Sequence, residues 1–560
     1  MSGGEPDLEI RAQKAAVRAL KRSIGTFDRH GRRKYIRDFL GDFSRYTEPA
    51  SYDDLVVRGF RSDVVFVGDY HALVSSQMFC ARFLDDLARR SNRLVLAMEM
   101  VFGRQQRVLD EFMSGAIEDD EFRRRIRYDD EWGYEWSGFA AILATARRYG
   151  IQVVGIDSEP RSEFRLIRRR DRYAARRIAE IFLHDERAKA VVFIGESHLA
   201  RNHLPLKLAQ ELANRQMEKR SLTIVQNIDS LYWQRAESGE SSRDIVRVEG
   251  SRYCVFNASP ITKYEAYRQT IERWKSQSDD DDVDLAPTVH RMIDTILRFL
   301  QIHPERRIVD RRDGLTVRLP DTYPEVYVHE GPPFIRDMMQ RYGLEEERIE
   351  QVLGHLSRSG SCFVPRINAI FVGSFNLTHA GEEASHFINY ALRGELYESW
   401  NGGARLEHDR FYISVMDEAI GYFGSKLIDP ARNHFFETDF YRLYKKDPQV
   451  VEEKTGYSFD EFTAIIDFIL LHKRFEKEYA KRDAVPAELL AGIRSRGSRF
   501  RILTHELGYF LGQQIYDGYQ RGLVTHEAIV ELYARRWDET SSALSAYLDW
   551  AARLAPLGST

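Results

Sequence analysis

The chain has 560 residues, of which 43% are hydrophobic and 30% are charged, and its formal net charge is -4. This length exceeds what one ordinary hydrophobic core supports, so at least two domains are expected. The apolar content suffices for packed cores and excludes a globally disordered chain, while the small net charge gives no general attraction to nucleic acid or anionic lipid.

The three cysteines, Cys80, Cys254 and Cys362, are far apart and lack CxxC spacing. This set predicts neither a disulfide framework nor a thiolate zinc site, and it fits a reducing compartment. The N-terminus has no apolar signal-peptide core, and no later segment offers about 18 uninterrupted apolar residues for a membrane span. We therefore expect a cytoplasmic protein without a membrane partner.

Residues 8–46 place apolar side chains at helical spacing, which predicts a helical extension over residues 1–58. From residue 62 the pattern changes to short apolar runs that end in polar residues: DVVFVGDYH, RLVLAMEM, IQVVGID, KAVVFIGESH, LTIVQNID and RYCVFNAS. The segments between them have helical periodicity and are long enough for crossover helices. We expect an α/β domain over residues 59–276, with a mostly parallel sheet and flanking helices.

Residues 277–287 are acidic and almost free of large apolar side chains, which predicts a solvated linker. Beyond it, residues 288–560 show mainly helical patterns, such as TVHRMIDTILRFLQ and DEFTAIIDFILLHKRFEKEYA. Two β candidates interrupt them: RIVDRRDGLTVRL, with Asp313-Gly314 as a hairpin signal, and CFVPRINAIFVG. The second half is therefore expected to be a mainly α-helical domain of unknown function.

Acidic and histidine side chains follow four of the predicted strands. They are Asp69 and His71 after the first strand, Glu99 in the second, Asp157 after the third, and Glu196 and His198 after the fourth; Gly68 and Gly195 precede the two histidines in GDYH and GESH. Because the carboxyl ends of parallel strands lie along one edge of a sheet, these residues are expected to converge on a ligand pocket.

The chemistry of this set leaves two alternatives. Imidazole and carboxylate groups suit Zn, Mn or Fe, which would activate a water molecule. Without a metal, Asp69 or Glu99 would orient His71 as a general base. We predict catalytic or metal-binding roles for His71, Glu99, His198 and Asp69, and cofactor binding by Gly68, Asp157, Gly195 and Glu196. The alternative for Asp157 is to cap the following helix or to pair with Arg161.

The motif order adds a resemblance. GDYH is followed by RLVLAMEMVFGRQQRVLDEFMSG, then by DDEWGYEWSGFAAILATARRYGIQVVGIDSEPR, and finally by VVFIGESHLARNHLP. This set, over residues 62–230, resembles the ChaN-like family of the haem-binding-uptake, Tiki and erythromycin-esterase-like superfamily. The resemblance implies an α/β domain with His71 and Glu99 in a shared pocket and His198 nearby. Some family members bind haem as surface lipoproteins, and more distant relatives are metal-dependent proteases or esterases.

Two features depart from the family. Asp69 stands where the family has a glutamate, and the lipoprotein signal of haem-uptake members is absent. The leading hypothesis is a protein that binds haem, iron or another metal ion in this pocket. The alternatives are a metal-dependent hydrolase of a small molecule or peptide, and a non-catalytic binding or scaffold module. Trp132, Tyr134 and other nearby aromatic residues are expected in the core, with an apolar ligand face as the alternative.

A second constellation lies in the C-terminal half. THAGEEASHF places His379, Glu383 and His386 on one face of a helix, and THELGYFLG supplies His505 and Glu506. Helical bundles build metal sites from such side chains, although neither segment has the complete H-E-x-x-H pattern. These five residues form a second candidate metal site, and the alternative is a buried hydrogen-bond network or a solvated face.

The segment from Arg161 to Arg177 is rich in arginine, which would suit an anionic ligand. The interleaved acids Glu163 and Asp171 favour a solvated helix face instead. No nucleic-acid motif accompanies the segment, and the chain has neither a Walker A sequence nor a G-x-G-x-x-G after a strand. We expect no nucleic-acid partner.

Overall fold

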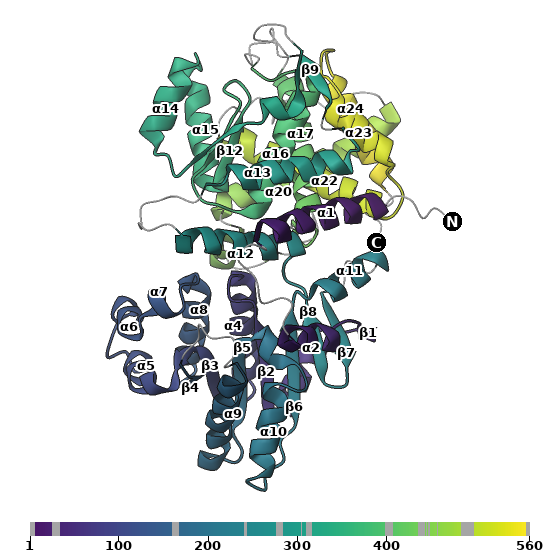
Figure 1. Cartoon of the computed structure of the whole chain (residues 1–560). Coiled ribbons are helices and arrows are strands. Elements are labelled where there is room, and N and C mark those ends of the chain that lie inside the picture. Colours follow the sequence, from purple (N-terminus) through teal and green to yellow (C-terminus); the bar gives the residue numbers. More distant parts are fainter. Residues whose placement is uncertain are drawn as a thin grey trace. The chain divides into compact units, whose positions relative to one another are not determined.

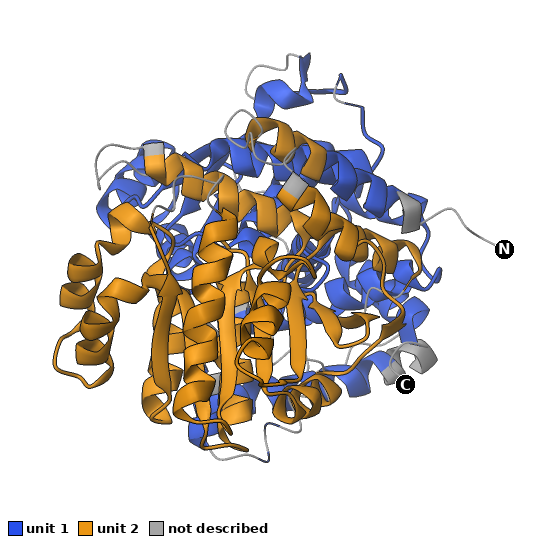
Figure 2. Cartoon of the chain, turned by 60° about the horizontal axis from the view of Figure 1, so that its bottom comes forward, with its two compact units in different colours: residues 1–16, 284–560 blue, residues 17–283 orange. Residues whose placement is uncertain are grey.

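The computed structural model describes residues 6–24, 34–159, 167–239, 244–275, 284–303, 305–309, 316–397, 407–434, 443, 445, 448–455, 457–482 and 498–555. Contacts between Cα atoms divide the chain into two compact units, coloured separately in Figure 2. One unit is Val17–Val283, and the other combines Met1–Ala16 with Asp284–Thr560. Residues 276–283 of the acidic segment lie outside the described residues, so the linker and the domain boundaries stay predictions.

The unit Val17–Val283 is built on an eight-stranded sheet with the order β1-β7-β8-β6-β2-β5-β3-β4 (Figure 1). Its strands are β1 (Glu48–Pro49), β2 (Val64–Asp69), β3 (Leu94–Phe102), β4 (Gln152–Asp157), β5 (Lys189–Gly195), β6 (Ser221–Gln226), β7 (Ile245–Glu249) and β8 (Arg252–Val255). Neighbours from β8 to β4 are parallel, and β7 pairs antiparallel with β1 and β8. The predicted fold class is confirmed; β1 and β7 were not predicted.

The helices of this unit cover both faces of the sheet. They are α2 (Lys34–Asp42), α3 (Tyr52–Arg61), α4 (Val74–Ala88), α5 (Gln106–Met113), α6 (Asp119–Ile126), α7 (Tyr128–Glu131), α8 (Trp136–Arg148), α9 (Ile167–His184), α10 (Leu204–Ala213), α11 (Asp229–Glu237) and α12 (Pro260–Lys275), with the short 3-10 turns Gly103–Gln105 and Glu196–Leu199. The division between the two units falls within the first helix, α1 (Pro6–Ile24), between Ala16 and Val17.

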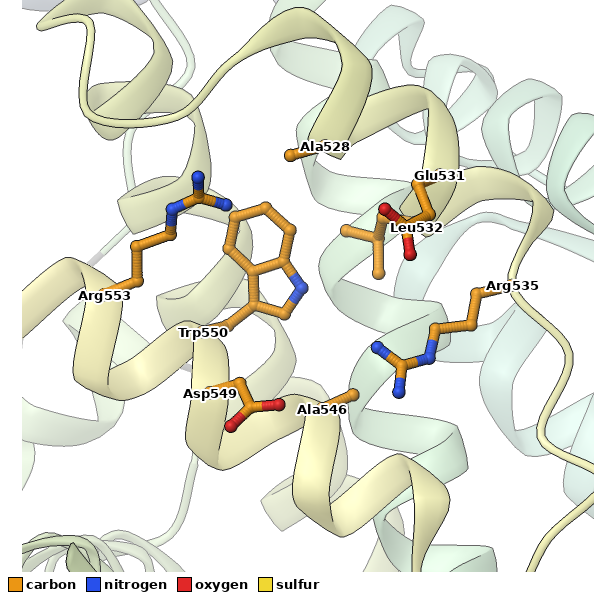
Figure 3. Close-up of a pocket in the computed structure, with 8 residues that line it drawn as sticks. All are labelled: Ala528, Glu531, Leu532, Arg535, Ala546, Asp549, Trp550 and Arg553. Atoms are coloured by element: carbon orange, nitrogen blue, oxygen red, sulfur yellow. The ribbon is translucent and has the colours of Figure 1, made fainter.

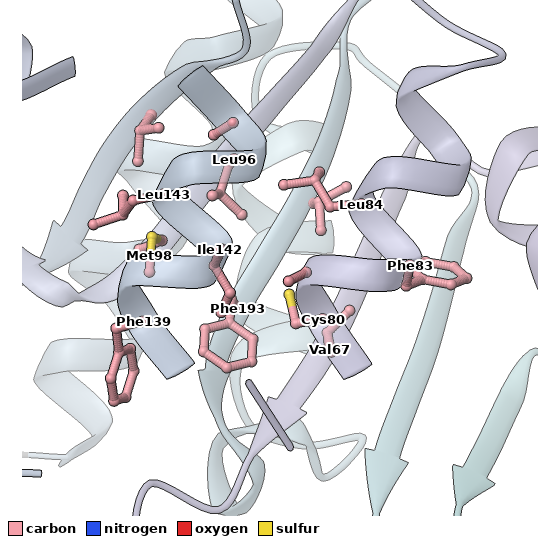
Figure 4. Packing of buried hydrophobic residues seen from close by; sticks show 14 of the residues in the cluster. Val67, Cys80, Phe83, Leu84, Leu96, Met98, Phe139, Ile142, Leu143 and Phe193 are labelled. Atoms are coloured by element: carbon pink, nitrogen blue, oxygen red, sulfur yellow. The ribbon is translucent and has the colours of Figure 1, made fainter. Parts of the chain in front are cut away.

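Two hydrophobic cores lie on opposite faces of the sheet. On one face, Met98 and Phe193 of the strands pack beneath α4 and α8, which contribute Cys80 and Ile142 (Figure 4). The other core joins the strands to α2, α9, α10 and α11. Because both faces are buried, the strands are continuously apolar, and the polar residues at their carboxyl ends lie at the edge where α/β sheets bind ligands.

The unit that combines Met1–Ala16 with Asp284–Thr560, blue in Figure 2, is mainly helical, as predicted. Its helices are α13 (Ala286–Phe299), α14 (Pro332–Arg341), α15 (Glu346–Ser359), α16 (Leu377–Arg393), α17 (Glu407–Ile428), α19 (Pro448–Thr455), α20 (Phe459–Arg482), α22 (Ser498–Gln520), α23 (His526–Ala534) and α24 (Ser542–Leu554). The hairpin of β9 (Arg307–Val309) and β10 (Thr316–Arg318) is present, although Asp313-Gly314 lies outside the described residues. A small sheet joins β11 (Glu325–Val328), β13 (Ala369–Val372) and β12 (Ser361–Val364).

In the part of the chain that the structure describes, no helix combines the length and apolar character needed to cross a membrane.

Glu9 of α1 is a buried carboxyl group in the helical unit. Its Oε1 accepts hydrogen bonds from Gln13 and from the Tyr516 hydroxyl, each at 2.9 Å, yet burial dominates and raises the pKa of Glu9 to about 7. Since this value exceeds the ordinary 4.5 of an unfolded chain, the folded state favours the protonated form. Stability from this group is therefore lost as the pH rises from about 4.5 to about 7.

Replacing Glu9 by glutamine is expected to raise the free energy of unfolding at pH 8 by about 3 kcal/mol, at about 1.4 kcal/mol per pKa unit. At pH 4 the substitution should have little effect, because the wild-type carboxyl group is then protonated in both states. Urea denaturation at the two pH values measures the difference. Equal effects at pH 4 and pH 8 would contradict this origin of the stability change.

Candidate functional site

The first part of the site follows β2. Nδ1 of His71 donates a hydrogen bond to Oδ2 of Asp69 at 2.7 Å, and the other oxygen of Asp69 accepts one from Gln77 at 2.6 Å. Asp69 is buried, whereas the His71 side chain is 22% exposed. Because the carboxylate holds Nδ1, Nε2 is the ring nitrogen that His71 presents to a ligand.

Glu99 lies in β3 at the centre of the site. Its Oε2 accepts a hydrogen bond from the backbone N–H of Gly195 at 2.7 Å, and its Oε1 pairs with the Arg170 guanidinium at 2.5 Å. Arg170, on α9, also pairs with Asp157 through Nε at 2.7 Å. Burial acts to raise the pKa of Glu99, but the charges of His198, Arg170 and His71 together hold it well below its usual range. Glu99 is therefore an ionised carboxylate.

His198 lies in the turn Glu196–Leu199 after β5. Its Nδ1 donates to Oδ1 of Asp171 at 2.6 Å, and its Nε2 lies 3.4 Å from Oε1 of Glu99. Burial lowers the pKa of His198, but Glu99 and Asp171 outweigh it and raise the pKa to about 9. Both nitrogens of this ring therefore face carboxylates, and the ring is positively charged at neutral pH.

Nε2 of His71 faces Glu99 from the other side, 3.8 Å from Oε2 and beyond hydrogen-bond distance. The structure thus brings together four of the predicted residues from three separate strand ends. We use the name strand-end cluster for Asp69, His71, Glu99, Asp157, Arg170, Asp171 and His198. Asp157 joins it through Arg170 and also accepts a hydrogen bond from the Ser158 N–H at 2.8 Å. Its predicted alternative partner, Arg161, lies outside the described residues.

The other predicted cofactor-binding residues divide between two places. A Cβ atom on Gly195 would lie 3.2 Å from Nε2 of His71 and 3.3 Å from Oε2 of Glu99, so Gly195 borders the space between these side chains. Glu196 instead contacts the buried Lys263 of α12, at 3.4 Å. Gly68 packs against Glu196, where a Cβ atom would lie 3.2 Å from the Cβ of Glu196. Glu196 therefore belongs to a neighbouring ion pair with Lys263, and Gly68 packs against that glutamate.

Arg170 and Asp171 are site residues that sequence reasoning missed. The prediction of a solvated arginine-rich face is wrong for these two, since Arg170 is 12% exposed and Asp171 only 1%. One signal was present: Asp171 stands three, four and seven residues before Ala174, Ala175 and Ile178, which are all buried. Helical geometry places these positions on one face, so Asp171 points inward with them.

Aromatic rings form one wall beside His71. The ring of His71 lies 4.5 Å from that of Trp132 and 5.1 Å from that of Tyr134, between centroids. Tyr134 in turn contacts Trp274 of α12 at 5.2 Å, and Trp274 is 47% exposed. Trp132 is buried in the hydrophobic core, as predicted, whereas Tyr134 is partly buried and continues the apolar surface to the exposed Trp274. Trp136, by contrast, packs on the buried Tyr128.

Four of the five residues of the second candidate metal site form two separate Glu–His pairs, and His379 lies apart from them. Glu383 of α16 lies 3.4 Å from His386 and accepts the Phe363 N–H at 2.7 Å. Glu506 of α22 lies 3.6 Å from His505, and it accepts hydrogen bonds from His434 at 2.8 Å and Tyr457 at 2.6 Å. His379 contacts the carbonyl oxygen of Ser359. These partners fit the buried hydrogen-bond network that was the alternative to a metal site.

Within the described ranges, no group of three or more His, Cys, Asp and Glu side chains is arranged to hold a metal ion. Both metal sites therefore stay predictions. A separate pocket of about 160 Å³ lies between α23 and α24, where Glu531, Arg535 and Trp550 line it (Figure 3). It contains none of the residues predicted from the sequence.

Comparison with known proteins gives a family match within the unit Val17–Val283. Residues 60–180 match the family model described as haem-binding uptake, Tiki superfamily, ChaN. Residues 60–180 carry a ChaN-like domain. No curated protein matches the chain.

Two solved structures were also matched. "Cofacial heme binding to ChaN of Campylobacter jejuni" is 14% identical, with 32% of this chain and 86% of that chain covered and a TM-score of 0.25. "The structure of the type III effector HopBA1" is 15% identical, with 38% and 97% covered and a TM-score of 0.28. Both scores are low, so the assignment depends on the family match. The ChaN-like domain contains the whole strand-end cluster except His198.

Proposed function

We propose that the strand-end cluster binds haem, with Nε2 of His71 as a ligand to the iron. The observation that carries this proposal is the setting of His71: Asp69 holds Nδ1, Nε2 lies 3.8 Å from Glu99 and beyond hydrogen-bond distance, and Trp132 and Tyr134 flank the ring. Haem iron is commonly held by a histidine, and metal-ligating histidines usually donate their other N–H to a carboxylate or carbonyl. The donor set therefore fits the group.

The surrounding residues have distinct tasks in this proposal. Tyr134 and the exposed Trp274 would supply an apolar wall for the porphyrin, and Trp132 supports the His71 ring from the core. Arg170 and the charged His198 hold Glu99 as an anion 3.8 Å from Nε2 of His71, where it would balance the positive charge of a bound iron. Bound haem would supply a redox-active iron. The match of residues 60–180 to a haem-binding uptake family supports the same ligand.

Titration with haem, followed by visible absorption, is the experiment that tests this proposal. Wild type is expected to shift the Soret band at stoichiometric haem, and His71→Ala should weaken binding about tenfold or more, which corresponds to about 1.4 kcal/mol. His184→Ala, a change at an exposed histidine of α9, is the matched control. Equal haem affinity in wild type and His71→Ala would contradict the proposal.

A hydrolase is the second candidate. Nε2 of His71 lies 3.8 Å from Oε2 of Glu99, beyond hydrogen-bond distance, so this nitrogen is able to accept a proton from water. Although burial lowers the pKa of His71, the hydrogen bond and charge of Asp69 and the charge of Glu99 raise it above the ordinary value, as suits a base. A water molecule hydrogen-bonded to Nε2 would donate its proton to that nitrogen as its oxygen attacks the carbonyl of an ester or peptide, and His71 would return the proton to the leaving alcohol or amine. Hydrolysis that is lost in His71→Ala, in a protein without haem affinity, would favour this candidate.

In the metal-dependent form of that hydrolase, Zn, Mn or Fe would bind the same residues. Arg170 already pairs with Glu99 and Asp157, two of the carboxylates available to such an ion. A divalent ion would therefore have to displace the guanidinium group or bind through His71 alone. Elemental analysis of the purified protein tests the metal-dependent hydrolase. Stoichiometric Zn, Mn or non-haem Fe is expected for this enzyme, and for neither the haem-binding protein nor the metal-free hydrolase.

A further inference from the structure

We propose that Tyr35 is a positioning residue of the strand-end cluster, and this inference rests on the proposed haem site. Tyr35 belongs to α2, which precedes the matched residues 60–180. Its side chain is buried, and its hydroxyl donates a hydrogen bond to Oδ2 of Asp171 at 2.9 Å. The same hydroxyl lies 3.2 Å from Nδ1 of His198. A segment outside the matched region thus reaches the site.

The ring of Tyr35 fixes the turn that carries His198. It stacks on the imidazole of His203, with 3.6 Å between centroids and 6° between planes. Nδ1 of His203 donates to the carbonyl oxygen of Ser197 at 2.9 Å, and Ser197 directly precedes His198 in the turn. Tyr35 therefore holds both components of the Asp171–His198 pair, the carboxylate through its hydroxyl and the turn through its ring.

This arrangement controls Glu99 through His198. Each oxygen of Asp171 has one donor, Tyr35 for Oδ2 and His198 for Oδ1. Without the tyrosine hydroxyl, Asp171 loses a donor on a buried oxygen, and its carboxylate and the His198 ring are held less firmly. Glu99 keeps its contacts with Arg170 and the Gly195 N–H but loses the fixed imidazole at 3.4 Å from Oε1. One of the contacts that order this carboxylate beside His71 is then lost, and the less ordered site is expected to bind haem more weakly.

The same geometry separates the roles of the two histidines. Both nitrogens of His198 face carboxylates, Asp171 at 2.6 Å and Glu99 at 3.4 Å, so His198 orients Glu99 and does not bind the ligand. In His71, Nδ1 is hydrogen-bonded to Asp69, whereas Nε2 lies 3.8 Å from Glu99. The sequence presents GDYH and GESH as equivalent motifs, whereas the residues packed around them give them different tasks.

Tyr35→Phe removes the hydroxyl and keeps the ring on His203. The matched control is Tyr46→Phe in the same unit, whose hydroxyl lies 3.4 Å from Ser238 and away from the site. The first readout is the NMR signal of the His198 Nδ1 proton, assigned by its loss in His198→Ala. The short hydrogen bond to Asp171 should place this signal far downfield in wild type and Tyr46→Phe. In Tyr35→Phe it should shift upfield or disappear through exchange with water.

The second readout is haem affinity, which should fall about fivefold in Tyr35→Phe and stay at the wild-type value in Tyr46→Phe. An unchanged Nδ1 signal in Tyr35→Phe would overturn the inference. So would a changed signal with unchanged haem affinity. If wild type does not bind haem but the signal still changes, Tyr35 does position His198 and the haem proposal alone fails.

Discussion

Replacing Arg170 by methionine is expected to lower the free energy of unfolding by about 3–5 kcal/mol at pH 7, the range for removing one partner of a buried ion pair. Arg170 pairs with Glu99 and Asp157, and both carboxylates are buried. Methionine keeps much of the apolar stem but leaves the two negative charges without their shared cation. The destabilisation should become smaller as the pH falls, because a protonated carboxyl group carries no charge for the guanidinium to neutralise.

Urea denaturation at pH 7 and pH 4 measures both parts of this prediction. Arg172→Met is the control, since Arg172 is exposed on the same helix, and a surface change of this kind is expected to cost less than about 0.5 kcal/mol. If Arg170→Met is no more destabilising than Arg172→Met, the ion pairs at the centre of the strand-end cluster do not stabilise the fold.

Gly195→Ala is expected to weaken haem binding at least a hundredfold, about 2.8 kcal/mol, with a small effect on stability. The backbone of Gly195 has φ -48° and ψ 131°, a conformation that alanine adopts without strain. The added methyl group would lie 3.2 Å from Nε2 of His71 and 3.3 Å from Oε2 of Glu99. It would therefore crowd Nε2, the atom through which His71 is proposed to bind the iron.

The control for this substitution is Gly41→Ala on α2, where nothing lies within 4 Å of the added Cβ atom. Both variants should keep the wild-type circular dichroism spectrum, and only Gly195→Ala should lose the Soret shift. Haem affinity that is unchanged in Gly195→Ala would place the ligand elsewhere on the protein.

Much of the fold was predictable from the sequence, because the buried strands β2 to β6 are continuous apolar runs separated by amphipathic helices. The meeting of His71, Glu99 and His198 followed from the same pattern, since strands that run parallel end at one edge. β1 and β7 were missed because β1 has two residues, too few to show a period, and β7 has only five, two of them the charged residues Arg247 and Glu249.

The partners of the site could not be predicted in the same way. Arg170 and Asp171 lie within a run of charged residues, and only the burial of one helix face separates them from their exposed neighbours. Tyr35 is 136 residues from Asp171, and no local pattern joins them. Hydrophobic periodicity indicates which face of an element is buried, whereas a hydrogen bond between distant side chains depends on how the elements pack.

The most direct measurement of the central claim is a crystal structure of the protein grown with haem, with anomalous diffraction at the iron edge. We predict an iron peak at about 2.0–2.1 Å from Nε2 of His71, the usual distance for an imidazole nitrogen on a metal, with Nδ1 still on Asp69. An iron peak bound to other side chains, with Nε2 of His71 unliganded, would contradict the account.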